Sequence, residues 1–209
     1  AKEGLPNLAR QDAAGAVLGD PGGFLAAVAQ DRRLLFPATV VAWGVCQAAD
    51  GTWLVPGYGA DGRLDQVYRR IAGKLLPTPG IWSAGKAHAL HLPASDFHPE
   101  RPNVVVCEGP WDGMVLWEVW PRDGTTNIVA VPGCTTWRDE WTALCRRKCV
   151  TLMYDSVHPP TLGGYKGMQR VAKRLSGVAA SVRYLKWGAE GFDPSKPSGY
   201  DVRDFLSGL

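Results

Sequence analysis

The sequence predicts an α/β fold in which an α+β lobe of antiparallel hairpins precedes a mainly parallel sheet flanked by helices. Two apolar runs that each end in a carboxylate, residues 103–108 and 150–155, are typical of buried parallel strands. Residues 39–69 instead alternate apolar and polar side chains around Asp-Gly turns, as antiparallel hairpins do. The 209-residue chain, of which 45% is hydrophobic, is long enough for one sizeable core or two small lobes.

The N-terminal half divides into an arm and a lobe. Residues 1–23 are rich in Gly and Ala with little pattern, which predicts an arm or linker. A short helix is expected over residues 24–30. Residues 24–102 form the predicted N-terminal lobe, and their last part, residues 77–102, is rich in Pro, Gly and His and would lead into the parallel sheet. Residues 103–209 form the second predicted domain.

The first parallel strand predicts an acidic site at its end. Its apolar residues stop at Glu108, Gly109 permits a tight turn, and a helix can open at Asp112 and run to Val119. Ligands of open α/β sheets bind in the crevice outside the carboxyl ends of the strands. Glu108 and Asp112 are therefore expected to face one crevice.

Two further acidic positions follow in the same order. Asp155 ends the second apolar run, before a helical pattern over residues 165–175, and Asp201 and Asp204 lie near the C-terminus. Each acid alone could be a turn residue or a first-turn helix acid. Three acidic positions on one sheet favour a Mg²⁺ site instead, because this hard cation takes carboxylate oxygens.

These residues resemble the Toprim fold, which bacterial and phage primases, type IA and type II topoisomerases and some nucleases share. The resemblance rests on the order Glu108-Gly109-x-x-Asp112, then Asp155 after a strand, then Asp201 before a C-terminal Phe-Leu. Residues 129–134 also look like the Toprim strand that ends in a glycine turn. The segments before the sheet, at 51–56, 61–69 and Lys74, resemble the N-terminal subdomain of phage primase-helicases, so the similarity spans about residues 35–209.

The resemblance implies a primase catalytic core, a nucleotidyltransferase that makes short RNA primers from ribonucleoside triphosphates on single-stranded DNA. By this resemblance Glu108 is the general acid/base, and Mg²⁺ or Mn²⁺ is held by Asp112, Asp155 and Asp201. Basic residues of the first lobe would hold nucleotide or template: Arg69 and Lys74, with Arg63 and Arg70. The expected partner is a replicative helicase, fused or separate, in the cytoplasm of a bacterium or of a phage-infected host.

One departure from the family pattern keeps two alternatives open. The family usually carries Asp-x-Asp after its second strand, but here Val157 follows Asp155 and Ser156. Val157 cannot bind a metal, and the imidazole of His158 suits softer metals than Mg²⁺. The chain could therefore be a Toprim nuclease that activates water with the same acids. It could also be a catalytically degenerate module that binds nucleic acid or a replication partner.

Composition and charge further limit the kinds of protein and of binding surface that this sequence can form. The net charge is only +3, so any phosphate-binding surface must be local. Five cysteines without a Cys-x-x-Cys pair indicate neither a disulfide framework nor a zinc module, which favours a reducing cytosol. No signal peptide or long apolar span is seen, and the absence of an initial Met suggests a fragment. Of nine tryptophans, Trp82 and Trp111 are candidates for stacking on bases, and Asp204 and His158 are weaker site candidates.

Overall fold

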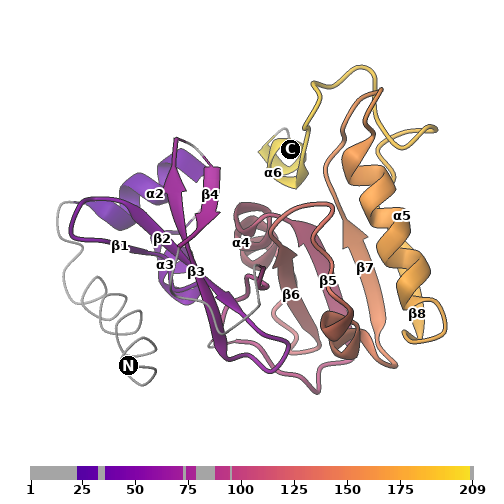
Figure 1. Cartoon of the computed structure of the whole chain (residues 1–209), viewed down its shortest axis with the longest axis horizontal. Coiled ribbons are helices and arrows are strands. Elements are labelled where there is room, and N and C mark those ends of the chain that lie inside the picture. Colours follow the sequence, from indigo (N-terminus) through magenta and orange to yellow (C-terminus); the bar gives the residue numbers. More distant parts are fainter. Residues whose placement is uncertain (1–22, 33–35, 73, 79–87, 95, 208–209) are drawn as a thin grey trace. The chain divides into compact units, whose positions relative to one another are not determined.

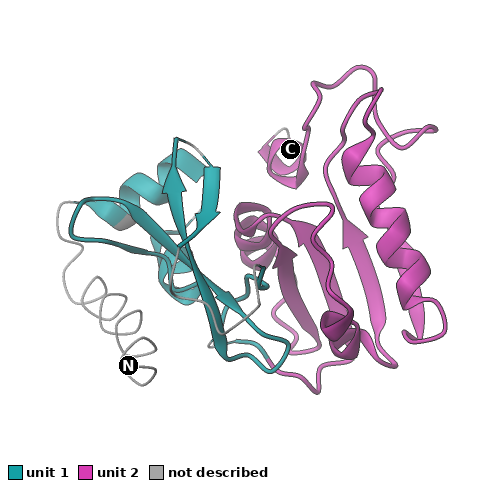
Figure 2. Cartoon of the chain, in the orientation of Figure 1, with its two compact units in different colours: residues 1–97 teal, residues 98–209 magenta. Residues whose placement is uncertain are grey.

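The computed structural model describes residues 23–32, 36–72, 74–78, 88–94 and 96–207, and it confirms the predicted α/β class. The chain divides into two compact units, residues 1–97 and 98–209 (Figure 2). One four-stranded sheet belongs to each unit: an antiparallel sheet to the first and a parallel sheet to the second. Within the described part of the chain, no helix is long and apolar enough to cross a membrane.

The first unit places two short helices beside an antiparallel sheet (Figure 1). The helices α2 (Phe24–Arg32) and α3 (Pro37–Ala42) pack on each other, and the expected helix over residues 24–30 is thus confirmed. The predicted arm over residues 1–23 lies, except for Gly23, outside the described residues. The sheet has the order β1-β2-β3-β4, with the bounds β1 (Cys46–Gln47), β2 (Trp53–Tyr58), β3 (Leu64–Ile71) and β4 (Lys74–Pro77).

A buried histidine ties a connecting segment to this sheet. His91 is 1% exposed, and its Nδ1 lies 2.8 Å from the carbonyl oxygen of Pro56 on β2. Its ring packs against that of Tyr68, with centroids 4.8 Å apart, while its Nε2 is buried without a hydrogen-bond partner. Burial lowers the pKa of His91 to about 4, and the hydrogen bond to Pro56 acts in the opposite direction. The ring is therefore neutral at pH 7, with the proton on Nδ1.

The second unit is built on a fully parallel sheet of order β6-β5-β7-β8 (Figure 1). Its strands are β5 (Asn103–Glu108), β6 (Thr126–Val131), β7 (Cys149–Met153) and β8 (Ser181–Tyr184). The helices are α4 (Pro110–Val119), the 3-10 helix η1 (Asp139–Cys145), α5 (Gly163–Leu175) and α6 (Val202–Ser207). β5 and β7 are neighbours, as the sequence predicts.

The central position of β5 explains its sequence. Val104 to Cys107 are all at most 2% exposed, because strands pair with β5 on both sides and helices add cover. Residues 98–102 lie with this unit, where His98 exchanges two backbone hydrogen bonds with the side chain of Asn127 on β6. Since every strand runs the same way, their carboxyl ends meet at one edge of the sheet.

The neutral state of His91 predicts a pH dependence of stability. An unfolded histidine titrates near pH 6.5 and the folded one near 4, so between these values the unfolded chain binds more protons. The contribution of His91 to the free energy of unfolding is therefore fully present above pH 6.5. It falls as the pH drops toward 4, by up to about 3 kcal/mol.

Urea unfolding from pH 7 to pH 4.5 measures this effect against His91→Asn, whose amide can still donate to Pro56. The variant should be less stable at pH 7, and its deficit should shrink as the pH falls. A deficit that stays constant over this range would contradict a buried neutral imidazole.

Candidate functional site

A pocket of about 230 Å³ lies at the carboxyl edge of the parallel sheet, entirely within the second unit. It receives acids from the ends of two strands and from the helix that follows β5, together with one guanidinium from α6. Its lining consists of Glu108, Gly109, Trp111, Asp112, Pro132, Gly133, Asp155 and Arg203. The structure thus gathers three of the acids predicted from the sequence, although Glu108 and Asp155 lie 47 positions apart in the chain.

The turn after β5 brings Asp112 beside Glu108. Gly109 has a φ of 83°, a conformation that favours glycine, and its N–H donates to the carbonyl of Val131 at 2.8 Å. Pro110 then begins α4, which suits the first helical position because proline has no N–H to lose. Asp112 consequently lies in the first helical turn, where it is only 3% exposed.

Glu108 presents one engaged and one free carboxylate oxygen. Its Oε1 accepts a hydrogen bond of 3.0 Å from the backbone N–H of Cys134, in the loop after β6. Its Oε2 is buried without a hydrogen-bond partner. Burial raises the pKa of Glu108, and the backbone N–H groups of Cys134 and Asp155, with the thiol of Cys134, oppose this effect less strongly. A carboxylate with raised pKa and an unused oxygen is equipped to accept a proton or a cation.

Close backbone packing sets the position of Asp155, which lies two residues past β7. A Cβ added at Gly164 of α5 would overlap the carbonyl oxygen of Asp155, and one added at Gly167 would overlap that of Cys134. The first turns of α5 therefore press directly on both loops that border the pocket. Burial, followed by the charge of Glu108, raises the pKa of Asp155 to about 10.

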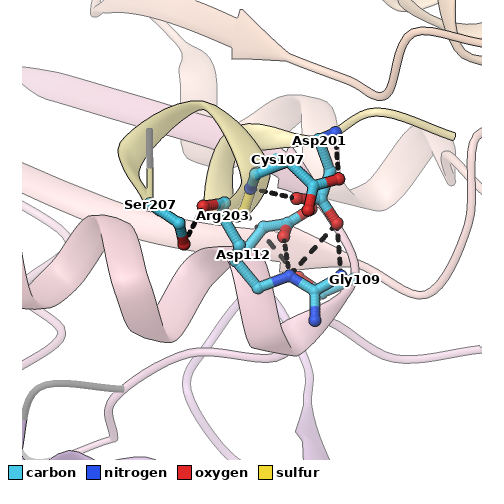
Figure 3. A network of polar contacts seen from close by, with 7 residues as sticks. Cys107, Gly109, Asp112, Asp201, Arg203 and Ser207 are labelled. Carbon is cyan, nitrogen blue, oxygen red and sulfur yellow. Dashed lines mark hydrogen bonds and ion pairs between the residues drawn. The ribbon is translucent and has the colours of Figure 1, made fainter. Parts of the chain in front are cut away.

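Arg203 of α6 pairs with two buried acids (Figure 3). Its Nε donates to Oδ1 of Asp112 at 2.7 Å and to Oδ2 of Asp201 at 3.1 Å, and its Nη2 also donates to Oδ2 of Asp201. Burial raises the pKa of Asp112, the charge of Asp201 adds to this effect, and Arg203 opposes it. Arg203 was not among the predicted site residues, although a cation two residues after an expected metal ligand was a usable signal.

Asp201 and Asp204 also form the N-terminal cap of α6. The N–H of Asp204 donates to Oδ1 of Asp201 at 2.9 Å, and the N–H of Asp201 donates to Oδ2 of Asp204 at 3.4 Å. Such a reciprocal pair is a capping box, which satisfies amide groups that have no partner within the helix. Asp204 thus has a local structural role. Asp201 accepts the cap hydrogen bond with Oδ1 and the hydrogen bonds from Arg203 with Oδ2.

The acids fit a divalent cation held by few protein ligands. Among the described residues, no group of three or more His, Cys, Asp or Glu side chains is arranged to hold a metal ion. Glu108 and Asp155 nevertheless line the same pocket, and the unpartnered Oε2 of Glu108 is a hard oxygen donor. Mg²⁺ is commonly bound by one or two carboxylates, with water and substrate phosphates completing its shell.

The weaker site candidates have different surroundings. Trp111 lines the pocket and is 9% exposed. His158 lies outside the pocket lining, with Nε2 3.1 Å from the carbonyl oxygen of Asp193 and its ring 5.0 Å from that of Phe192. Trp82 lies outside the described residues.

All four predicted basic residues belong to the first unit, on or beside β3 and β4. Arg69 pairs with Asp50 at 2.5 Å, and Arg70 stacks on Trp53 with its guanidinium carbon 4.4 Å from the ring centroid. Arg63 and Lys74 are exposed, and Arg63 lies 3.7 Å from the carboxylate of Asp61. Arg69 and Arg70 are thus held in fixed local contacts.

No protein-family model and no curated protein sequence matches this chain. Solved structures do match its fold. The E. coli primase catalytic core matches 99% of this chain and 75% of its own, with a TM-score of 0.65 and 15% identity. The zinc-binding and RNA polymerase domains of the Aquifex aeolicus primase match 90% of this chain and 46% of theirs, with a TM-score of 0.51 and 19% identity.

A phage protein has the same fold. The primase fragment of the bacteriophage T7 primase-helicase protein matches 82% of this chain and 66% of its own, with a TM-score of 0.55 and 18% identity. The expected Toprim-fold, primase-like core is therefore confirmed at the level of the fold.

The packing of α5 predicts a large difference between two adjacent glycines. Gly164→Ala should lower the free energy of unfolding by about 1–3 kcal/mol, since its Cβ must displace the backbone of Asp155. Gly163→Ala is the matched control, because its Cβ would meet only Sγ of Cys134, at an ordinary 3.5 Å. Urea unfolding of both variants measures the difference, and equal stabilities would refute the close approach.

Proposed function

We propose that this chain, which has the fold of primase catalytic cores, is a metal-dependent nucleotidyltransferase that makes short RNA primers. Its substrates would be ribonucleoside triphosphates and a single-stranded DNA template. The observation that carries the proposal is the buried, unpartnered Oε2 of Glu108 beside Asp155, at the carboxyl edge of the parallel sheet. An acidic pocket of this kind can hold the metal and receive a proton in one place.

Glu108 is the proposed general base. Its raised pKa brings the carboxylate closer to neutral pH, where proton transfer from a primer 3'-hydroxyl is more effective. The N–H of Cys134 holds one oxygen in place, which limits the directions that the other oxygen can take. A divalent ion bound by the acids would stabilise the charge that develops on the phosphates. Asp155 is the acid best placed to share that ion with Glu108.

Basic residues of the first unit would bind the phosphates of the nucleotide and the template. Lys74 and Arg63 are exposed and therefore accessible to a ligand. Arg69 already pairs with Asp50, and Arg70 already stacks on Trp53. Arginine offers forked donors and lysine a compact charge, and both suit phosphate oxygens. We further propose a replicative helicase as partner, in line with the primase-helicase neighbour from bacteriophage T7, and a cytoplasmic site of action.

Two observations favour a second candidate function, a module that binds nucleic acid without catalysis. Arg203 holds Asp112 and Asp201, and Val157 stands where a further carboxylate is expected from the resemblance. Both features reduce the number of oxygens available to metal ions. The two candidates differ in one measurable property, because only the first joins nucleotides.

Incorporation of labelled ribonucleotides on mixed single-stranded DNA templates, with Mg²⁺ or Mn²⁺, tests the proposal. Short RNA products are expected, and Glu108→Gln should reduce their rate at least about 100-fold, since it removes the base but keeps the side-chain shape. Glu190→Gln is the matched control, because Glu190 is exposed and outside the pocket lining.

Other outcomes of this assay identify the alternatives. Template cleavage that depends on Glu108 would mean a nuclease. Retained DNA binding without synthesis or cleavage would favour the binding module. Normal turnover of Glu108→Gln would remove the proposed base.

The salt dependence of binding tests the role of the exposed basic residues. Lys74→Ala and Arg63→Ala should each weaken binding to single-stranded DNA, and each should reduce the slope of log affinity against log salt by about 0.7. Fluorescence anisotropy of a labelled oligonucleotide at several salt concentrations measures the slope. Arg146→Ala is the control, since Arg146 is exposed before β7, at the opposite edge of the parallel sheet. An unchanged slope in both test variants would exclude them from the phosphate-binding surface.

A further inference from the structure

We infer that Arg203 is a built-in cation of this site, which occupies Asp112 and Asp201 and leaves Glu108 and Asp155 to bind a single divalent metal ion. The inference rests on the metal site of the proposed function.

Both oxygens of Asp201 are already engaged. Oδ1 accepts the N–H of Asp204 in the cap of α6, and Oδ2 accepts two N–H groups of Arg203. The same guanidinium holds Oδ1 of Asp112 at 2.7 Å. The two acids are 5% and 3% exposed, so little water is present to take over these contacts. An ion that used Asp201 as a ligand would have to break a cap or an ion pair.

The guanidinium of Arg203 is itself part of the pocket wall. Arg203 is one of the pocket-lining residues, and its side chain is 25% exposed, compared with 4% for that of Asp112. Figure 3 shows it reaching from α6 to Asp112, at the start of α4. Arginine keeps its charge at all relevant pH values, so it neutralises these acids permanently.

Counting charges and donors leads to one metal ion. Four carboxylates carry four negative charges when ionised, of which Arg203 neutralises one and a single divalent ion two more. The acids of the pocket that Arg203 does not contact are Glu108, with its unpartnered Oε2, and Asp155. Val157 adds no oxygen beside them. Two carboxylates with water are a usual protein contribution to one Mg²⁺.

Mn²⁺ binding without nucleotide or DNA tests the inference independently of synthesis. Electron paramagnetic resonance of free Mn²⁺ should give one bound ion per chain for the wild type and for Arg203→Lys, which keeps the charge. Arg203→Gln should give two, because a neutral side chain of similar reach frees Asp112 and Asp201. Arg146→Gln, an equal charge change at the opposite edge of the sheet, should bind one ion with unaltered affinity.

A second pair of variants keeps the test decisive if Arg203→Gln fails to fold, as circular dichroism would reveal. Asp155→Asn removes a proposed ligand and should weaken Mn²⁺ binding at least about tenfold. Asp201→Asn removes an acid that Arg203 already holds, and its effect should stay below about threefold. Equal losses in the two variants would overturn the inference.

The outcomes separate the inference from the proposed function. Two ions bound by the wild type, or one ion bound by both wild type and Arg203→Gln, would overturn the role of Arg203 while primer synthesis could still be found. No Mn²⁺ bound by any protein would reject both the inference and the metal-dependent reaction. One ion in the wild type and two in Arg203→Gln, without primer synthesis, would reject the reaction and leave the role of Arg203 supported.

Discussion

The second unit depends on the balance of charge among buried and partly buried acids that lie close together. Burial raises the pKa of Glu108, Asp112 and Asp155 because the charged forms lose water, and neighbouring negative charges raise the pKa of Asp112 and Asp155 further. Buried charges are stable only when other groups compensate them. Arg203 supplies part of that compensation from α6 and so ties the C-terminal helix to the start of α4. A divalent ion can supply the rest.

The parallel sheet provides the coarse geometry of the site, and glycines provide the fine geometry. Register between β5 and β7 brings the two strand ends to the same edge, and the left-handed turn at Gly109 directs α4 back across it. Gly164 and Gly167 then allow α5 to touch the backbones of Asp155 and Cys134. Through Cys134 the same packing reaches Glu108, whose Oε1 accepts the Cys134 N–H. Four segments of chain thus determine where two carboxylates lie.

Two arginines of the first unit are engaged by contacts within that unit. Arg69 pairs with Asp50, while Arg70 lies over Trp53 and 3.4 Å from the carboxylate of Asp31. These contacts link β3 to Trp53 of β2 and to Asp31 of α2, whereas Arg63 and Lys74 are exposed. The small net charge of the whole chain agrees with a local phosphate-binding surface.

The sequence by itself determined the fold class, the adjacency of the two main parallel strands and the order of the acids. Apolar runs, a Glu-Gly turn and helical periodicity are local patterns, so they can be recognised without knowing how the elements pack. Only the tertiary structure decided the partners of those acids. Arg203 lies 91 residues from Asp112 in the chain, His158 lies outside the pocket lining near Asp193, and the close approach of Gly164 involves the backbone of another segment. Such contacts depend on how whole elements pack, and no local pattern specifies which distant group will compensate a buried charge.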